Sequence, residues 1–507
     1  MRYRAGKSWA IDHDGVHMEP QPAEVTWVGV DIGTQSVRVM VVDDTGRVLA
    51  LGSQPLDSHR RSANGRQHEQ DPHQWWDAVG AASRAAFATL PGGRPGAAVG
   101  AVAICSTSGT VLLTDDRGAP LTPALMYDDA RAVDELDRIN RHVGAAVQLS
   151  WALPKIDWLF RHHTRTGPAP RYVAHSADVV AAGLVGHRVH TDSSHALKSG
   201  YDVVSGRWDA TLLDAAGVEP ATMPDVVRPG TELGTLTAEA AEHTGIPAGT
   251  PVVAGMTDGC AAQIAAGALA PGSWNSVLGT TLVLKGVSAN LIDDPDGAVY
   301  SHLHPDGGWL PGGASNVGAG AVAAEFATDD LDALNAAATA FEPAAAVTYP
   351  LTARGERFPF VRPDAVGFQL GEVSGPAERY AALLQGVAFV ERLCFEHLAA
   401  IGADVDGGIS VTGGATRNAY WNQLRADVLG RPLVLPATPE PAFGMTVLAS
   451  ARDARVTDRA ARMVGRRDVV QPRPDAHERL STKYDELTAE LVRRGYLTAA
   501  SLTGSRP

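Results

Sequence analysis

The first regular pattern of apolar positions lies in residues 26–50. Apolar residues at 27–30 predict a strand, a small-residue turn follows at 31–36, and the apolar run 37–42 predicts a returning strand. The turn contains glycine and hydroxyl residues and can expose backbone N–H groups, while Asp31 adds a carboxylate. Backbone donors suit phosphate oxygens, and a carboxylate suits the Mg²⁺ that accompanies them. An ordinary hairpin explains the same pattern equally well.

The same arrangement recurs in the second half of the chain. Residues 274–278 predict a strand, 279–281 a turn of glycine and threonine, and 282–285 a returning strand. A repeated supersecondary unit predicts two similar half-molecules more strongly than one motif does. Two such turns that face each other across a cleft could hold a nucleoside triphosphate from both sides.

Further apolar runs predict buried strands at residues 99–104, 251–255 and 409–411. Helical patterns separate these strands, and residues 132–250 are predicted to be mostly helical. Alternating strands and helices in both halves favour an α/β fold with crossover connections.

The length of 507 residues is long for one hydrophobic core and predicts two large domains. Residues 1–25 are polar and are expected to form a flexible extension. The Pro271-Gly272 pair marks the expected boundary between a first domain, 26–270, and a second domain, 271–507.

Composition narrows the classes of partner. Hydrophobic residues make up 45% and charged residues 20%, which argues against disorder. A formal charge of −14 disfavours an extended basic face for nucleic acid. The three cysteines are widely separated and predict a reducing compartment, the cytoplasm. No apolar run is long enough to span a membrane.

Asp258 is the candidate general base. It follows the predicted strand 251–255 in a turn that ends in Gly259 and opens a small-residue helix. In α/β folds, reactive side chains gather at the carboxyl ends of strands. A carboxylate there could accept the proton of a hydroxyl that attacks a phosphoryl group. Capping of the helix by Asp258, worth about 1 kcal/mol, is the competing interpretation.

With these motifs in consistent order from about residue 27 to 435, the chain resembles the actin, heat-shock chaperone and sugar kinase superfamily and, within it, the FGGY carbohydrate kinases. The resemblance implies an actin-like ATPase fold, also called ribonuclease H-like, with two similar α/β domains around a central cleft. It also implies that ATP and Mg²⁺ are used, that Asp258 is the catalytic base, and that Asp31 organises Mg²⁺, partly through water, and can contact the sugar.

The resemblance also implies a set of nucleotide-binding residues. These are Thr34, Gln35 and Ser36 in the first turn, Gly279, Thr280 and Thr281 in the second turn, and Gly313, Gly413, Gly414 and Asn418 on the ribose and base side. A Gly-Gly pair alone is more often only a turn, but Gly413-Gly414 follows a predicted strand and precedes a predicted helix. Arg38, on the strand after the first turn, could reach the phosphates or lie exposed.

The sugar is expected at the loop after the predicted strand 99–104, where Ser108 and Gly109 are the candidate contacts. Xylulose kinases of this family tend to carry Met-His-Gly there, whereas this chain has Thr107-Ser108-Gly109 and so resembles the D-ribulose kinase-like branch more closely. That branch has Asp-Gly directly before the loop, and this chain departs from it with Cys105-Ser106.

Three charged residues near this loop have open roles. Asp129 and Arg131 resemble a family segment that shapes the sugar pocket, or they form a surface pair worth under about 1 kcal/mol. Lys155 is a weaker candidate for the pocket than for a structural or solvated position.

These expectations combine into an ATP-dependent kinase that phosphorylates the terminal hydroxyl of a ketopentose, with D-ribulose favoured. The alternatives are the same chemistry on D-xylulose or another polyol, a catalytically silent sugar or nucleotide sensor, and a chaperone- or actin-like ATPase. The expected partners are the sugar and MgATP, with neither nucleic acid nor membrane, and a homodimer is compatible with them.

Overall fold

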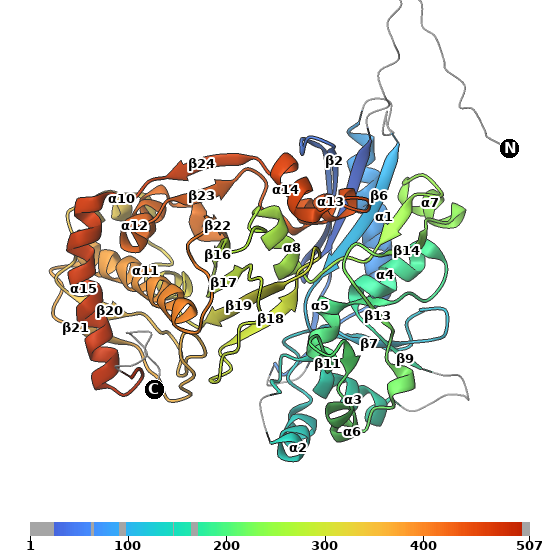
Figure 1. Ribbon diagram of the computed structural model, residues 1–507, viewed down its shortest axis with the longest axis horizontal. Coiled ribbons are helices and arrows are strands. Elements are labelled where there is room, and N and C mark those ends of the chain that lie inside the picture. The colour runs from blue at the N-terminus through green and yellow to red at the C-terminus, as the bar shows by residue number, and fades with distance from the viewer. Residues whose placement is uncertain (1–24, 62–64, 91–97, 145–146, 164–170, 499–507) are drawn as a thin grey trace, which may run out of the picture.

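The computed structural model describes residues 25–61, 65–90, 98–144, 147–163 and 171–498. It shows two α/β halves that lie side by side, each built on a mixed β-sheet (Figure 1). The strands of the first sheet come from the first half of the sequence, and those of the second sheet come from the second half. The predicted two-domain α/β class is confirmed. The expected extension, residues 1–25, lies outside the described residues except for Val25.

The strands of the first half are β1 (Thr26–Ile32), β2 (Ser36–Asp43), β3 (Val48–Pro55), β4 (His59–Arg61), β5 (Gln67–Gln70), β6 (Val99–Ser106), β7 (Leu112–Thr114), β8 (Ala124–Leu125), β9 (Tyr172–Ala174), β10 (Thr191–Asp192), β11 (Tyr201–Asp202), β12 (Arg207–Trp208), β13 (Val226–Val227), β14 (Glu232–Thr235) and β15 (Pro251–Val253). Its helices are α1 (Pro72–Ala88), α2 (Val133–Val143), α3 (Ala152–His162), α4 (Ser176–Val185), α5 (Ser193–Ala196), η2 (Leu197–Ser199), α6 (Ala210–Ala216), η3 (Pro220–Thr222), α7 (Ala238–Thr244) and α8 (Asp258–Ala265).

The strands of the second half are β16 (Trp274–Leu278), β17 (Leu282–Gly286), β18 (Val299–Leu303), β19 (Trp309–Ser315), β20 (Val347–Tyr349), β21 (Phe368–Leu370), β22 (Ile409–Thr412), β23 (Leu433–Pro436) and β24 (Arg466–Val470). Its helices are α9 (Gly320–Glu325), α10 (Leu331–Ala338), α11 (Pro376–Ala400), η4 (Gly414–Arg417), α12 (Ala419–Leu429), α13 (Pro441–Ser450), α14 (Val456–Met463) and α15 (Pro474–Arg493).

The first sheet has the order β14-β15-β6-β1-β2-β3. β1 pairs antiparallel with β2 and parallel with β6, and β15 pairs parallel with β6. Because the parallel strands β1, β6 and β15 end at the same edge, the sheet brings the segments that follow them together. In this register Asp31 lies opposite both Arg38 and Cys105.

The second sheet repeats the pairing of the first. Its order is β18-β19-β17-β16-β22-β23-β24, with β16 antiparallel to β17 and parallel to β22. The two turns close alike: Gly33 N–H donates to the Ser36 carbonyl at 3.1 Å, and Gly279 N–H donates to the Thr281 carbonyl at 3.1 Å. The two similar half-molecules that the repeated motif predicts are therefore present in the sheets.

Residues 132–250 are less helical than predicted. Where the structure describes them, helices α2 to α7 alternate with the short strands β9 to β14, and β14 forms an edge of the first sheet. β14 reads Glu-Leu-Gly-Thr, a sequence too short and too polar to carry a strand signal of its own. Its position comes from antiparallel pairing with β15.

Helix α13 comes from the second half of the chain but packs on the first sheet. It contacts β1, β6 and α8, whereas α1 packs on β2 and β3 at the opposite face of the sheet (Figure 1). Two glycines allow this close approach: a Cβ at Gly29 would lie 1.9 Å from the Ala442 carbonyl oxygen, and one at Gly444 would lie 2.0 Å from that of Ala261. The start of α13, at Pro441, thereby reaches the edge where β1 and β6 end.

The contact of α13 with the sheet predicts a large effect of one methyl group. Gly29→Ala is expected to destabilise the protein by roughly 2–3 kcal/mol, because backbone on both sides must move. Gly408→Ala is the control, since a Cβ there meets nothing within 4 Å. Urea unfolding followed by tryptophan fluorescence measures both variants, and equal midpoints would contradict the interpretation.

None of the helices within the described ranges combines the length and the apolar character that a membrane crossing requires.

Candidate active site

The two candidate carboxylates, Asp31 and Asp258, line one cavity of about 440 Å³. Asp31 lies near the end of β1, and Asp258 is the first residue of α8, which follows β15 after the short segment 254–257. The other lining residues are Gly33, Thr34, Arg38, Thr107, Ser108, Tyr127, Lys198 and Pro441. The cavity thus joins the first predicted phosphate turn, the predicted sugar loop and the predicted base.

Asp31 is buried, and its carboxylate accepts two side-chain hydrogen bonds. Arg38 Nη1 donates to Asp31 Oδ2 at 2.9 Å, and Cys105 Sγ donates to Asp31 Oδ1 at 3.6 Å. Burial, followed by repulsion from Asp258, raises the pKa of Asp31 to about 6 in spite of Arg38. Of the two roles considered for Arg38, the structure shows the side chain at the cavity, paired with Asp31.

Asp258 is partly accessible from the cavity. The N-cap of α8 is Thr257, and the Asp258 carboxylate accepts one backbone hydrogen bond, from Gly259 N–H at 2.7 Å. Capping therefore does not explain the position of Asp258. Burial raises the pKa of Asp258, while the Gly259 N–H and the charges of Lys285, Lys198 and His195 favour its ionised form.

Two lysines near Asp258 were not recognised in the sequence. Lys198 lines the cavity from η2. Lys285, on β17 of the second half, reaches the turn of the first half: its Nζ lies 3.4 Å from Cys260 Sγ, and a Cβ at Gly259 would lie 3.4 Å from the same Nζ. Lys285 interrupts an otherwise apolar predicted strand, and this polar residue was the signal in the sequence for a functional position. Lys198 lies in a segment that carries no comparable signal.

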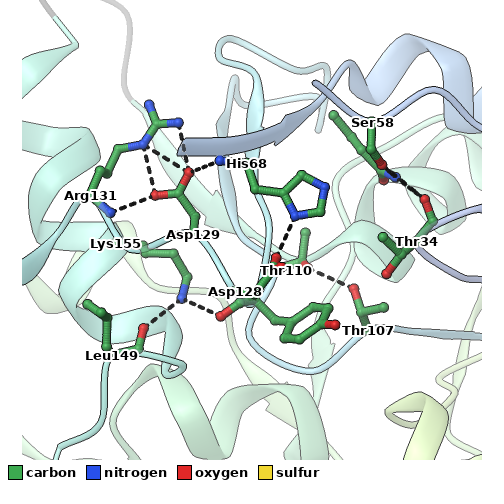
Figure 2. Close-up of polar contacts among 12 residues, drawn as sticks. Thr34, Ser58, His68, Thr107, Thr110, Asp128, Asp129, Arg131, Leu149 and Lys155 are labelled. Atoms are coloured by element: carbon green, nitrogen blue, oxygen red, sulfur yellow. Dashed lines mark hydrogen bonds and ion pairs between the residues drawn. The ribbon is translucent and has the colours of Figure 1, made fainter. Parts of the chain in front are cut away.

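Two side-chain hydrogen bonds from other segments hold the backbone of the first predicted phosphate turn. Ser58 Oγ donates to the Thr34 carbonyl at 3.0 Å, and Gln70 Nε2 donates to the same oxygen at 2.6 Å (Figure 2). Thr34 lines the cavity, Ser36 is partly buried at the start of β2, and the Gln35 side chain is exposed. These bonds hold the turn open at the edge of the cavity.

The second turn, Gly279-Thr280-Thr281, packs against two glycines that the sequence analysis did not consider. Gly320 N–H donates to the Thr280 carbonyl at 3.0 Å, and a Cβ at Gly318 would lie 2.5 Å from that oxygen. The Gly-Ala-Gly spacing ahead of α9 was the signal for this contact.

The predicted base-side residues have structural contacts of their own. Gly413 adopts φ +91°, and a Cβ there would lie 2.5 Å from the Leu278 carbonyl oxygen, while Gly414 begins η4. Asn418 caps α12 through Trp421 N–H at 3.0 Å, and its amide nitrogen donates to Asn335 Oδ1 at 2.8 Å. Gly313 is buried beneath Phe358, where a Cβ would lie 2.7 Å from the ring. Their contacts with a nucleotide stay predictions.

The predicted sugar loop is held by local contacts and contains one buried hydroxyl without a partner among the described residues. Thr107 and Thr110 join their hydroxyl groups at 2.7 Å (Figure 2), and Gly109 adopts φ +90° where a Cβ would lie 2.5 Å from the Ser150 carbonyl oxygen. Ser108 lines the cavity, and its buried Oγ has no hydrogen-bond partner among the described residues. Such an unpaired hydroxyl is suited to a polar ligand.

Asp129 and Arg131 form a buried pair and not a surface pair. Arg131 donates two hydrogen bonds to Asp129 Oδ2, at 3.0 and 2.8 Å, and His68 N–H donates to Asp129 at 2.7 Å (Figure 2). Arg131 also pairs with Glu69 at 2.7 Å. The pair holds the turn that carries Tyr127 into the cavity; neither of its members lines the cavity.

Lys155 has the structural role that the sequence analysis favoured. Its ammonium donates to the Leu149 carbonyl oxygen at 3.2 Å (Figure 2). It also donates to the carbonyl oxygens of Tyr127 and Trp151, at 3.3 and 2.7 Å. Burial lowers the pKa of Lys155 to about 7. The side chain supports the Tyr127 turn from behind the cavity.

Comparison with known proteins matches nearly the whole chain. The N-terminal domain of the FGGY family of carbohydrate kinases matches residues 26–265, and its C-terminal domain matches residues 274–452. A xylulose kinase from Streptomyces coelicolor is 29% identical over 486 residues, which cover 92% of this chain and 95% of that protein. An autoinducer-2 kinase from Escherichia coli is 24% identical over 498 residues, covering 91% of this chain and 93% of that protein.

Solved structures have the same fold. The crystal structure of xylulose kinase from Rhodospirillum rubrum superimposes with a TM-score of 0.81 and 28% identity, covering 92% of this chain and 98% of that one. Plasmodium falciparum glycerol kinase with ADP gives a TM-score of 0.79 at 16% identity over 92% of this chain and 98% of that one, a likeness of fold alone.

Proposed function

This chain belongs to the FGGY family of carbohydrate kinases and is an ATP-dependent sugar kinase, and we propose that it phosphorylates the terminal hydroxyl of a ketopentose, with D-ribulose as the favoured acceptor. The observation that carries the proposal is the unpaired Ser108 hydroxyl in the same cavity as Asp31 and Asp258. A sugar hydroxyl can complete the hydrogen bonding of Ser108 while another approaches Asp258.

In the proposed reaction, Asp258 accepts the proton of the sugar hydroxyl as its oxygen attacks the γ-phosphorus of ATP, and ADP leaves. Charges at Lys285 and Lys198 favour the carboxylate form that this step requires. In this proposal Thr34 and Arg38, which line the cavity, and the second turn Gly279-Thr280-Thr281 hold the triphosphate. Closure of the two domains around the substrates excludes water, which would otherwise compete with the sugar as acceptor of the phosphoryl group.

We propose that Mg²⁺ accompanies ATP at Asp31. The described residues contain no cluster of three or more His, Cys, Asp and Glu that could hold a metal. One carboxylate together with phosphate oxygens and water is the usual environment of Mg²⁺ in kinases, so Asp31 fits. Burial and the nearby Asp258 raise the pKa of Asp31, and Arg38 is the one cation paired with it among the described residues, so a bound cation would favour its carboxylate form. The ion would neutralise charge on the transferring phosphoryl group.

Two sugars are candidates for the acceptor of the phosphoryl group, D-ribulose and D-xylulose. Ser108 in place of the histidine typical of xylulose kinases supports D-ribulose, whereas similarity to the xylulose kinase from Streptomyces coelicolor supports D-xylulose. These sugars are epimers at one carbon. Assaying ADP release with D-ribulose, D-xylulose, L-ribulose, ribitol and glycerol, and without sugar, separates them. Preference for a pentulose supports the proposal. Equal release with and without sugar indicates an ATPase, and no release with any acceptor indicates a sensor.

Ser108→Ala is expected to raise the KM for the preferred sugar roughly 3- to 10-fold, because one hydrogen bond is lost. The KM for ATP should not change. Ser83→Ala is a matched control, since Ser83 Oγ is also buried without a partner among the described residues but lies in α1. Initial-rate kinetics measure both variants, and an unchanged sugar KM in Ser108→Ala would place the sugar elsewhere.

A further inference from the structure

A buried chain of polar side chains lies behind the cavity and centres on His195 of α5. His195 Nδ1 lies 2.5 Å from Asp192 Oδ2, and His195 Nε2 lies 2.9 Å from Ser106 Oγ. Solvent reaches neither the His195 nor the Ser106 side chain. None of these three residues lines the cavity.

These hydrogen-bonded side chains connect the sugar loop to the turn that carries the proposed base. Ser106 is the last residue of β6, directly before Thr107 of the loop. On the other side, Ser194 Oγ donates to Asp192 Oδ1 at 2.6 Å and accepts a hydrogen bond from Thr257 N–H at 2.9 Å, directly before Asp258. Helix α5 is therefore a bridge between the segments that follow β6 and β15.

The bridge contains a charged pair, a protonated His195 and an ionised Asp192. Burial disfavours charge on both partners, but their mutual attraction is stronger: it raises the pKa of His195 to about 9 and lowers that of Asp192 to about 2. A protonated imidazole has two donors, so Nε2 donates to Ser106 Oγ. The Ala177 N–H donates to the same oxygen at 3.2 Å.

The contact depends on the hydroxyl of Ser106, because glycine or alanine at this position would offer no acceptor for His195 Nε2.

We propose that His195 is a positioning residue that holds the sugar loop and the Asp258 turn in a fixed relation and whose positive charge favours the carboxylate form of Asp258. The proposal rests on the proposed function in one respect, the role of Asp258 as base. Charged and titratable groups that face this region come from several elements: Asp31 on β1, Asp178 and His175 at α4, Lys198 on η2, Lys285 on β17 and His302 on β18.

Three variants test the proposal. His195→Asn removes the charge and the bond to Ser106, whereas Ser106→Ala removes only the bond. His175→Asn is the matched control, because His175 is equally buried, lies 5.4 Å from His195 ring to ring and makes a comparable 2.9 Å contact with Ser199 Oγ. His175 makes none of the contacts that join the loop to the base turn.

His195→Asn is expected to lower kcat roughly tenfold with the KM for ATP unchanged, because the base and the acceptor are misaligned. The acid limb of the kcat profile should move to higher pH by about half a unit, as the carboxylate loses a nearby cation. Ser106→Ala should lower kcat by roughly threefold without moving the acid limb. His175→Asn should lower the Tm but leave kcat and the acid limb in place.

Equal losses of kcat in His195→Asn and His175→Asn would show a merely structural role and overturn the proposal, as would an unmoved acid limb in His195→Asn. Thermal unfolding against pH gives a readout that does not need a substrate. Because the folded-state pKa of His195 lies above its usual 6.5 and that of Asp192 below its usual 3.8, the Tm advantage of the wild type over His195→Asn should be complete between pH 3.8 and pH 6.5 and decline towards pH 9.

This second measurement separates two failures. If the wild type phosphorylates no sugar but the Tm advantage declines as expected, the proposed function fails and the charged bridge stands. If the Tm advantage does not depend on pH, His195 is not charged and the inference fails whatever the substrate.

Discussion

Asp258→Asn is expected to lower kcat by roughly 10²- to 10⁴-fold, the range that loss of a general base produces. Asparagine keeps the size of the side chain and the contact with Gly259 N–H but cannot accept the proton of the attacking hydroxyl. Nucleotide binding should change little, because the turns that we propose hold the triphosphate lie on other elements.

The measurement compares steady-state kcat with ATP affinity from equilibrium titration. Asp330→Asn is a suitable control, since Asp330 caps α10 in the second half and asparagine is an equally good cap. Retained activity in Asp258→Asn, with normal acceptor specificity, would remove Asp258 from the role of base.

Asp31→Asn is expected to have opposite effects on activity and stability. Loss of the carboxylate should lower kcat by roughly 10²- to 10³-fold, because charge on the transferring phosphoryl group is no longer compensated by a well-held Mg²⁺. The Mg²⁺ concentration needed for half-maximal activity should rise as well. A variant with unchanged Mg²⁺ dependence would show that Asp31 does not organise the ion.

The stability effect of Asp31→Asn follows from the raised pKa. Burial and the nearby Asp258 raise the pKa of Asp31 from 3.8 to about 6, so ionised Asp31 destabilises the folded protein. That penalty is complete above pH 6 and disappears as the pH falls towards 3.8. The variant should therefore be more stable at pH 8 by up to roughly 2–3 kcal/mol, with a smaller gain at pH 5.

Differential scanning calorimetry between pH 5 and pH 8 measures this effect. Asp202→Asn is a control at a residue of β11 that does not line the cavity and whose pKa is lowered by hydrogen bonds instead. Replacing that aspartate should not stabilise the protein at pH 8. A destabilised Asp31→Asn at pH 8 would show that its pairing with Arg38 outweighs the repulsion from Asp258.

Local patterns were enough to predict the two sheets and much of the cavity. The apolar runs that became β1, β2, β6, β15, β16, β17 and β22 are bounded by glycine or by small polar residues, and short-range sterics determine such boundaries. The position of Asp258 was also predictable, because the end of a buried parallel strand is where α/β folds present side chains.

Contacts between distant segments were not predictable from one sequence. Lys285 reaches the base turn only because the second sheet lies against α8, and His195 meets Ser106 across 89 residues of chain. Asp129 and Arg131 are two residues apart, and the sequence could not tell a buried pair from an exposed one, since burial depends on Glu69 and the backbone of β5. Such contacts follow from packing of the whole fold and leave no periodic signal.

The placement of α13 has a consequence for synthesis of the protein. The face of the first sheet that carries Trp27, Met40 and Ala103 is covered by Phe443, Met445 and neighbouring residues of α13. While the ribosome is still making the second half, this apolar face has no permanent partner. The first half is therefore expected to stay incompletely folded and chaperone-dependent until about residue 450 has left the exit tunnel, even though it comes first in the chain.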